Sequence, residues 1–366
     1  MAGLIDCVVG ARPNFMKIAP LLRALETPPC SRVCLVHTGQ HYDTNMSDVF
    51  FEQLGIRVPD VLLEVGSDTH ARQTARIMER YEEHLIASHP AGVVVAGDVN
   101  STLACSLTAA KLQIPVAHLE AGLRSFDRRM PEEINRIVTD ALADVLLVTE
   151  ESGQQNLLLE GIGEKKIHLI GNLMIDTLYR ELPRARDLNI PARFGLQERR
   201  FGLVTMHRPS NVDDPAVLGR LLALLNEISR PLPLVFPIHP RTRARIEAAG
   251  LADALRSPGI VATDPLGYHE NLGLMAAARI VLTDSGGMQE ETTALGVPCL
   301  TLRENTERPI TVERGTSTLV GNDPDLIRRH FFDVLEGRYK RHEMIPLWDG
   351  HAGKRAALVL RQAWVI

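Results

Sequence analysis

Short apolar runs of strand length alternate with longer amphipathic segments along this chain, and this alternation limits the possible folds more than any other feature. In the first half, the expected strands are 4–10, 32–39, 92–98, 114–122 and 145–151. The helices expected between them are 17–26, 100–113 and 131–143. Strands that alternate with helices predict a parallel sheet with helices on both of its faces.

The alternation begins again in the second half. The expected strands are 200–207, 231–239, 259–264, 279–284 and 297–302, and the expected helices are 216–229, 269–278 and 287–296. A chain of 366 residues suits two domains of about 150–200 residues each. The sequence therefore predicts an α/β protein with two Rossmann-like domains, 1–172 and 173–349. The joint is expected near 171–191, where charges and prolines interrupt the periodicity, and 350–366 is expected to form a last helix with an apolar stripe that includes Trp364.

Composition argues against several classes of protein. The net charge is −5, so no overall basic field attracts the chain to nucleic acid or to an anionic membrane. Aromatic residues make up 4% of the chain, which is few for a platform that stacks single-stranded nucleic acid. The chain has no apolar stretch of about 18 residues, so no membrane span is predicted. The N-terminus has no basic leader.

The five cysteines are odd in number and scattered. Cys30 and Cys34 are close in sequence, but they have no second pair and no histidine cluster near them, so a zinc site is not expected. We therefore interpret the cysteines as reduced thiols and expect a cytoplasmic location.

Ligands of open parallel sheets bind beyond the carboxyl ends of the strands, so the predicted site is the cleft between the two domains. After the first strand, Gly10 is expected to permit a tight turn, and Arg12 and Lys17 follow it. Asp98 ends the third strand and Glu120 ends the fourth. Each of these could instead be an ordinary surface charge, cap or turn residue.

The stretch "MPEEINR" opens the helix expected at 131–143. Glu132 and Glu133 suit the first turn of a helix, where their only role could be a favourable interaction with the helix dipole. Glu132 and Arg136 share one face with Asp140, so one of the two glutamates could turn inward. Together with Asp98 and Glu120, that would gather up to three carboxylates, and like charges held close separate an acid from a base. No histidine is interleaved at ligand spacing, so a metal ranks low.

The second domain supplies the opposite charge. His207 and His239 follow its first two strands in equivalent positions. Ser285, Gly286 and Gly287 then form a turn into a helix, where a diphosphate could approach the backbone N–H groups. Glu290 or Glu291 lies about one turn into that helix, placed to bond a ribose, and Thr306, Glu307 and Arg308 add to the same rim. The pattern is neither GxGxxG nor a P-loop, so neither NAD nor ATP hydrolysis is predicted.

Nine stretches in order resemble the non-hydrolysing UDP-N-acetylglucosamine 2-epimerase family. They are "GARPNFMKIAPLL", "TGQHYD", "GDVNSTLA", "HLEAGLR", "MPEEINR", "HRPSN", "PIHPRTR", "DSGGMQEE" and "TERP". Each is weak alone, but the ordered set covers nearly the whole chain and is highly specific. The resemblance implies the glycosyltransferase-B architecture, with the last helix packing back on the first domain, and a homodimer.

The resemblance also implies residue roles. UDP would bind in the second domain, with His207, Ser285, Gly286 and Gly287 near the diphosphate, Glu291 on the ribose and Arg12 reaching across from the first domain. Lys17, Asp98, Glu120, Glu132 and His239 would line the sugar site. We therefore expect Lys17, Asp98, Glu120, Glu132 and His207 to be catalytic, and we add Arg136 and Arg308 to the substrate-binding candidates.

The implied reaction inverts C2 of UDP-N-acetylglucosamine to give UDP-N-acetylmannosamine, through elimination of UDP to a 2-acetamidoglucal and its re-addition. It needs no cofactor and would serve a polysaccharide or a secondary metabolite. Two stretches, "TGQHYD…MSDVFFEQLGI" and "LRSF…MPEEINRI", also resemble the branch that epimerises UDP-2,3-diacetamido uronic acids. A hydrolysing epimerase that releases N-acetylmannosamine and UDP remains open, as does a glycosyltransferase of the same fold.

Overall fold

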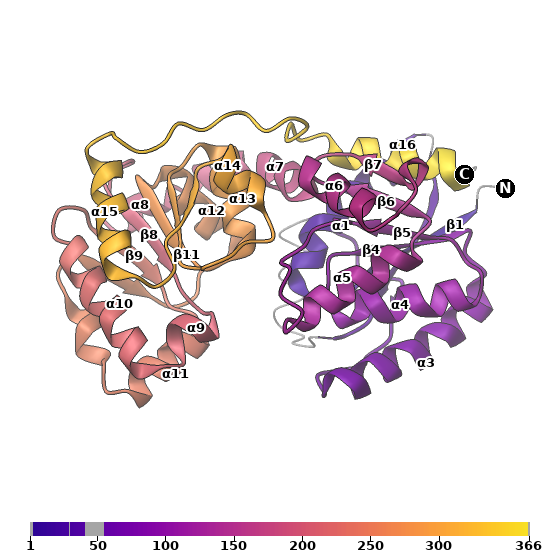
Figure 1. Ribbon diagram of the computed structural model, residues 1–366, viewed down its shortest axis with the longest axis horizontal. Coiled ribbons are helices and arrows are strands. Elements are labelled where there is room, and N and C mark those ends of the chain that lie inside the picture. Colours follow the sequence, from indigo (N-terminus) through magenta and orange to yellow (C-terminus); the bar gives the residue numbers. More distant parts are fainter. Residues whose placement is uncertain (1–2, 29, 41–54, 365–366) are drawn as a thin grey trace. The chain divides into compact units, whose positions relative to one another are not determined.

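The computed structural model describes residues 3–28, 30–40 and 55–364, with the backbone alone for 12 and 13 (Figure 1). The chain divides into two compact units, one of 1–177 with 346–366 and one of 178–345. Each unit is built on its own sheet, and every strand pair in both sheets is parallel. The predicted α/β class is therefore confirmed.

The first unit contains a seven-stranded sheet in the order β3-β2-β1-β4-β5-β6-β7. Its strands are β1 Leu4–Val9, β2 Arg32–His37, β3 Val61–Leu62, β4 Gly92–Ala96, β5 Val116–Leu119, β6 Val145–Val148 and β7 Ile167–Leu169. Its helices are α1 Arg12–Glu26, α3 His70–Ser88, α4 Asn100–Lys111, α5 Pro131–Leu142, α6 Glu151–Leu159 and α16 Ala352–Trp364. The sequence pattern did not predict helix α3 or the short strands β3 and β7, which have two and three residues.

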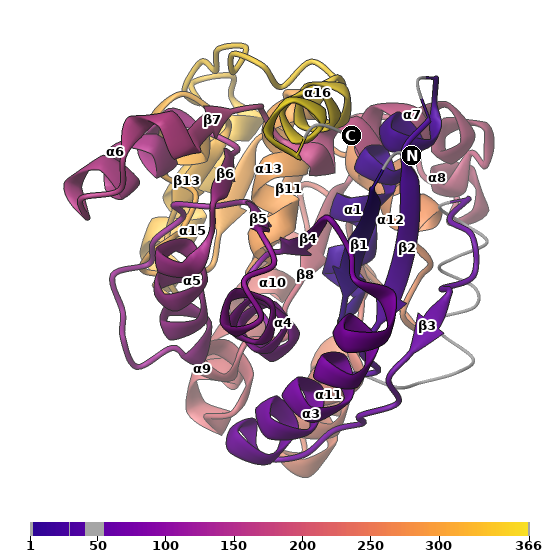
Figure 2. The same cartoon turned by 90° about the vertical axis from the view of Figure 1, so that its right-hand side faces the viewer.

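Helices lie on both faces of this sheet, as the order of its strands requires. The chain moves outward through α1 in one direction and through α4 in the other, and right-handed crossovers place such helices on opposite faces. Helix α4 packs between α3 and α5, while α1 packs along α16 (Figure 2). The apolar side chains of β1, β2 and β4 meet those of α3 and α4 in a buried core.

The second unit contains a six-stranded sheet in the order β10-β9-β8-β11-β12-β13. Its strands are β8 Gly202–Thr205, β9 Leu234–Pro237, β10 Ile260–Thr263, β11 Ile280–Thr283, β12 Cys299–Thr301 and β13 Ser317–Leu319. Its helices are α8 Ile190–Arg193, α9 Pro209–Val212, α10 Pro215–Ile228, α11 Pro240–Ala248, α12 Tyr268–Ala277, α13 Gly286–Leu295, α14 Pro309–Glu313 and α15 Pro324–Leu335. Separate apolar cores lie on its two faces, one with α10 and α15 and one with α8 and α12.

The segment expected to contain the joint, 171–191, is helical over most of its length. Helix α7, Leu173–Asp187, spans the boundary between the units and contains Pro183. Its buried residues include Leu173, Ile175 and Leu178, so an apolar face offsets the cost of a proline within the helix. Among the described residues, no helix has both the length and the apolar character needed to cross a bilayer.

Helix α16 returns the chain to the first unit. Two backbone N–H groups at its start, those of Ala352 and Gly353, donate to the Asp176 carboxylate. The Trp364 ring lies so close to Gly92 of β4 that a Cβ there would be 2.6 Å from it. Gly353 lies against the backbone of α1, where an added Cβ would be 2.7 Å from the carbonyl of Pro20.

We expect Gly353→Ala to destabilise the protein, although alanine normally favours a helix by about 1 kcal/mol over glycine. The added methyl group meets backbone atoms that cannot rotate away, and overpacking of this kind costs about 1–3 kcal/mol. Scanning calorimetry should show a lower melting temperature for Gly353→Ala and an unchanged one for Lys354→Ala, at the exposed position next to it. A Gly353→Ala protein that melts at or above the wild-type temperature would contradict this packing.

Candidate active site

The turn after β1 is held by the side chain of Asn14. Its Oδ1 accepts hydrogen bonds from the N–H groups of Gly10, at 3.4 Å, and Ala11, at 3.0 Å, and its Nδ2 donates to the carbonyl of Ala96 at 2.8 Å. Gly10 was expected to allow a tight turn, but its φ does not lie in the left-handed region. Glycine is needed there for close approach, because a Cβ would lie 2.2 Å from Oγ of Ser101. The first turn of α1 is thereby fixed against β4 and α4.

Lys17 of α1 and Glu120, which follows β5, form a buried ion pair. Nζ of Lys17 lies 2.5 Å from Oε2 of Glu120, and their side chains are 9% and 4% exposed. Gly97 lies against both, since an added Cβ would be 3.1 Å from Nζ of Lys17 and 3.8 Å from Oε2 of Glu120. The structure therefore brings together two of the predicted site residues from distant parts of the sequence.

The backbone of Glu120 is strained. Its φ is +68°, in the left-handed region that side chains with a Cβ seldom adopt. Such a conformation costs on the order of 1–3 kcal/mol and persists only when its surroundings enforce it. The strained residue is the one whose carboxylate pairs with Lys17.

Behind this pair lies a buried chain of polar groups that begins at His118. Its Nε2 lies 2.8 Å from the carbonyl oxygen of Gly97, and its Nδ1 lies 2.6 Å from Oδ1 of Asp140. Each ring nitrogen of His118 therefore faces an oxygen. The other oxygen of Asp140 accepts the N–H of Gly122 at 3.0 Å and pairs with Arg124 at 2.7 Å. Burial alone would raise the pKa of Asp140, but His118 and Arg124 lower it below its ordinary value.

The two glutamates at the start of α5 have different surroundings. Glu133 is buried and accepts the N–H groups of Ser125 and Phe126, both at 2.9 Å, so it holds the loop before the helix. Glu132 is half-buried, and within the described residues its carboxylate makes no hydrogen bond or ion pair. The helical pattern alone left both open, and the family resemblance pointed to Glu132, whose carboxylate has no partner among the described residues.

Asp98 is held by Arg136 rather than lying bare at the end of its strand. Nη2 of Arg136 is 3.2 Å from Oδ2 of Asp98, and Nη1 of Arg136 is 3.0 Å from Oε2 of Glu133. The Arg136 side chain is 4% exposed and that of Asp98 is 34% exposed. Arg136 was expected to bind substrate, and the structure shows it linking two carboxylates of this edge.

Arg12, the other basic residue expected after β1, has a side chain that lies outside what the structure describes. Among the described residues, the carboxylates and histidines at these strand ends form no group of three that could hold a metal ion.

In the second unit, Asp284 organises the loop after β8. Its Oδ2 accepts the N–H groups of His207 and Arg208, both at 2.9 Å, and the amide of Asn211 at 3.1 Å. Its Oδ1 lies 2.9 Å from Nδ1 of His207. Burial would raise the pKa of Asp284, but the hydrogen bonds and charge of His207 keep it below its ordinary value. The His207 side chain is 40% exposed, so its ring is oriented by Asp284 and still open to a ligand.

His239 lies near His207, with 5.4 Å between the ring centroids. It also begins α11, because its Nδ1 accepts the N–H of Arg241 at 3.2 Å. Arg241 itself pairs with Asp213, and Arg243 pairs with Asp264. The two histidines are thus brought together, while the arginines that follow His239 form surface ion pairs.

Helix α13 begins with the residues predicted to receive a diphosphate. Gly286 and Gly287 form its first turn, and Ser285 precedes it without a side-chain bond to the helix. The first N–H groups of a helix lack intrahelical partners and carry partial positive charge, so this start suits an anion. Gly286 lies close to the side chain of Glu307, since an added Cβ would be 2.8 Å from its Oε1.

Two neighbouring glutamates of α13 have separate partners. Oε1 of Glu290 lies 2.7 Å from Nε of Arg308, and Oε1 of Glu291 accepts the hydroxyl of Tyr268 at 3.1 Å. Burial raises the pKa of Glu291 to about 8, with the Tyr268 hydrogen bond lowering it and the charge of Glu290 raising it. Arg308, expected on the substrate, is a buried partner of Glu290.

The sequence did not point to every residue that shapes this site. His118, Asp140 and Tyr268 had no predicted function. The available signal for His118 was a histidine inside an otherwise apolar strand, which needs a buried partner. Nothing in the sequence identifies Asp140 as that partner.

Two Rossmann-like units with parallel sheets define the glycosyltransferase-B class of fold. The family model described as UDP-N-acetylglucosamine 2-epimerase matches residues 23–361. The chain belongs to this family, as its motifs predicted.

Individual relatives agree over nearly the whole chain. The UDP-N-acetylglucosamine 2-epimerase of Methanococcus maripaludis is 40% identical over 96% of each chain. The UDP-2,3-diacetamido-2,3-dideoxy-D-glucuronate 2-epimerase of Pseudomonas aeruginosa is 43% identical over 87% of this chain and 89% of that protein. The crystal structure of the Methanocaldococcus jannaschii UDP-GlcNAc 2-epimerase in complex with UDP-GlcNAc and UDP is 41% identical, with a TM-score of 0.87 over 98% of this chain and 99% of that one.

The raised pKa of Glu291 predicts a dependence of stability on pH. The carboxyl has an ordinary pKa of 4.5 when unfolded and one of about 8 when folded, so the folded protein favours the protonated form. Its contribution to stability is full below the unfolded value and is lost as the pH rises through about 8.

Glu291→Gln cannot ionise, so we expect its melting temperature to gain on the wild type as the pH is raised from about 5 to about 9. Each unit of pKa shift corresponds to about 1.4 kcal/mol, so the free energy of unfolding of the variant should rise by a few kcal/mol relative to that of the wild type. The exposed control Glu247→Gln should keep a constant difference from the wild type. A difference for Glu291→Gln that also stays constant would contradict the raised pKa.

Proposed function

We propose that this protein interconverts UDP-N-acetylglucosamine and UDP-N-acetylmannosamine by inverting C2 of the sugar, without net hydrolysis. The observation that carries the proposal is the buried Lys17–Glu120 pair at the carboxyl edge of a parallel sheet, in a member of this family. The two relatives named UDP-N-acetylglucosamine or UDP-GlcNAc 2-epimerase, from the two methanogens, support the substrate.

The chemistry follows from the weak acidity of the C2 proton. No carbonyl group lies beside that carbon, so direct removal of the proton is unfavourable. Elimination avoids the difficulty: the C1–O bond to UDP breaks as the C2–H proton is lost, and 2-acetamidoglucal forms. UDP then adds back to C1, and a proton returns to C2 on the opposite face. The reaction begins and ends at the same oxidation level, so no redox cofactor is required.

The second unit suits the departing UDP. Negative charge develops on the diphosphate as the C1–O bond breaks, and donors already aimed at it lower the barrier. Candidate donors are the start of α13 at Ser285, Gly286 and Gly287, together with the exposed ring of His207. Glu291 is the candidate for a ribose hydroxyl.

The first unit suits the sugar. Glu120 pairs with Lys17, and its carboxylate is the candidate to support the positive charge that develops at C1 when UDP leaves. Glu132 has no competing partner within the described residues and can take up and return a proton. Asp98 is held by Arg136 and is a second candidate for proton transfer.

The Pseudomonas relative supports a second candidate substrate, a UDP-2,3-diacetamido uronic acid. The same elimination would apply, because the leaving group and the C2 proton are unchanged. The two substrates differ at C3 and C6, so the same assay with each nucleotide sugar separates them.

Proton NMR in D2O tests the reaction directly. We expect UDP-N-acetylglucosamine incubated with the protein to gain deuterium at C2, with the nucleotide attached in both epimers. Free UDP and N-acetylmannosamine as the accumulating products would instead identify a hydrolysing enzyme. If deuterium exchange occurs with the UDP-2,3-diacetamido uronic acid but not with UDP-N-acetylglucosamine, the former is the substrate of this protein.

The two glutamates of α5 provide a matched test of the acid–base assignment. We expect Glu132→Gln to lower kcat by about 10²–10⁴-fold, the usual contribution of general acid–base catalysis, with the melting temperature unchanged. Glu133→Gln removes a charge that holds Arg136 and the loop at Ser125 and Phe126, so it should lower the melting temperature. The assignment is wrong if Glu132→Gln keeps wild-type kcat.

A further inference from the structure

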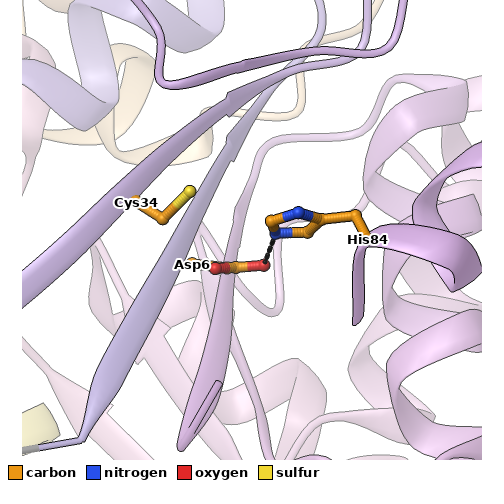
Figure 3. A group of neighbouring side chains, drawn as sticks. All are labelled: Asp6, Cys34 and His84. Atoms are coloured by element: carbon orange, nitrogen blue, oxygen red, sulfur yellow. Dashed lines mark hydrogen bonds and ion pairs between the residues drawn. The ribbon is translucent and has the colours of Figure 1, made fainter. Parts of the chain in front are cut away.

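Three potential metal ligands meet in the first unit, apart from the residues of the proposed active site. Asp6 of β1, Cys34 of β2 and His84 of α3 each offer one ligand atom, and these atoms lie within 4.8 Å of one another (Figure 3). Asp6 and Cys34 are paired across the two parallel strands, so their side chains leave the sheet on the same face. His84 meets them from the helix that covers this face. Figure 3 shows the Asp6 carboxylate between the other two side chains.

Only one oxygen of the Asp6 carboxylate has hydrogen-bond partners among the described residues. Its Oδ2 accepts the Tyr81 hydroxyl at 3.1 Å and lies 2.8 Å from Nε2 of His84. Its Oδ1 is fully buried and has no hydrogen-bond partner among the described residues. The residue as a whole is 0% exposed, so bulk solvent does not reach this oxygen. A buried acceptor without a partner costs on the order of 1–3 kcal/mol, and more when it is charged.

An ion pair that only anchors α3 to the sheet does not account for this geometry. The bonds from Tyr81 and His84 to Oδ2 already provide such an anchor, and the second oxygen gains nothing from them. A cation placed among the three side chains would satisfy Oδ1, use the Cys34 sulfur and keep the Tyr81 bond as support for the carboxylate. Outer contacts of this kind orient metal ligands in proteins.

We propose that Asp6, Cys34 and His84 form a binding site for a divalent transition-metal cation, of which Zn²⁺ is the best match. Thiolate, imidazole and carboxylate are the ligands that zinc takes, at about 2.0–2.3 Å, in tetrahedral geometry. Those bond lengths place neighbouring ligand atoms about 3.3–3.8 Å apart, so the Cys34 and His84 side chains need to adjust only slightly. Water can occupy the fourth position, since the His84 side chain is 13% exposed.

The metal would have a structural role. It would join β1, β2 and α3, and its binding would displace the thiol proton of Cys34, because a thiolate is the ligand. The site contains none of the residues assigned to the epimerase reaction, so the two proposals can fail independently. Cysteine spacing predicted no zinc site because His84 lies far from Cys34 in the sequence; only the fold brings them together.

Cobalt is the probe for the experiment, because Co²⁺ occupies zinc sites and absorbs light. The full-length protein is freed of metal with a chelator, dialysed and titrated with Co²⁺. We expect a near-ultraviolet band from thiolate-to-cobalt charge transfer and visible absorption typical of tetrahedral cobalt. Both should saturate at about one ion per chain and be abolished by added Zn²⁺.

Three variants assign the site. Cys34→Ser and His84→Gln should lose the thiolate band and the rise in melting temperature that Zn²⁺ gives the wild type. Cys30→Ser, at an exposed cysteine of the same region, is the matched control and should keep both. The far-ultraviolet circular dichroism spectrum should be unchanged in all three, which shows that they are folded whether or not the epimerase proposal holds. The proposal is overturned if the wild type gives no saturable thiolate band, or if either Cys34→Ser or His84→Gln gives the wild-type band and melting shift.

Discussion

Buried charge at the carboxyl edge of the first sheet determines how the surrounding backbone is arranged. A buried charge is tolerated only when it is paired and hydrogen-bonded. The chain from Gly97 through His118 and Asp140 to Arg124 meets this requirement, with each acceptor facing a donor. It also fixes the position of Gly97, against which Lys17 and Glu120 lie. Removal of one partner from such a network typically costs about 3–5 kcal/mol, so stability and the placement of the Lys17–Glu120 pair depend on the same contacts.

In the second unit, a single residue provides the pairing that a buried charge needs. Asp284 accepts from two backbone N–H groups and one amide and pairs with a histidine ring, so a single buried carboxylate orders the loop after β8. Asp284 also follows β11, directly before Ser285 and the start of α13. One side chain therefore links the orientation of His207 to the position of the helix start. This explains how a loop and a helix from distant parts of the sequence could act on one diphosphate.

The parts of the fold that the sequence predicted were those with strong periodicity. The apolar strands β1, β2, β4, β5 and β6, and those from β8 to β12, were found in the expected order. Strands β3 and β7 have two and three residues, too few for a pattern to emerge. Helix α7 was missed because Pro183 and the charges around it were interpreted as a break, although its buried face preserves the helix.

The candidate site was predictable to the level of strand ends and no further. The rule for parallel sheets placed Lys17, Asp98 and Glu120 at one edge, because it depends only on topology. It could not pair Lys17 with Glu120, since that contact depends on tertiary packing, and the positive φ of Glu120 is not visible in the sequence. Nor could it separate Glu132 from Glu133, because adjacent residues of a helix differ by about 100° in direction and both suited the first turn. Partners such as His118 and Asp140 depend on tertiary packing alone.

Three buried carboxylates show how the surroundings of one chemical group define different roles. Asp284 has partners for both oxygens, and the pKa of this group is lowered, so it remains a fixed negative anchor. Glu291 accepts one hydroxyl at a buried position beside Glu290, and its pKa is raised, so its charge depends on pH and on what binds it. Asp6 has partners on one oxygen while its other oxygen is buried beside a sulfur and an imidazole. A neutral ligand could satisfy that oxygen, but a cation would also balance the carboxylate charge and draw in the thiolate. Because these three differences arise from contacts and not from residue type, the same reasoning that identifies Asp284 as an anchor identifies Asp6 as a metal ligand.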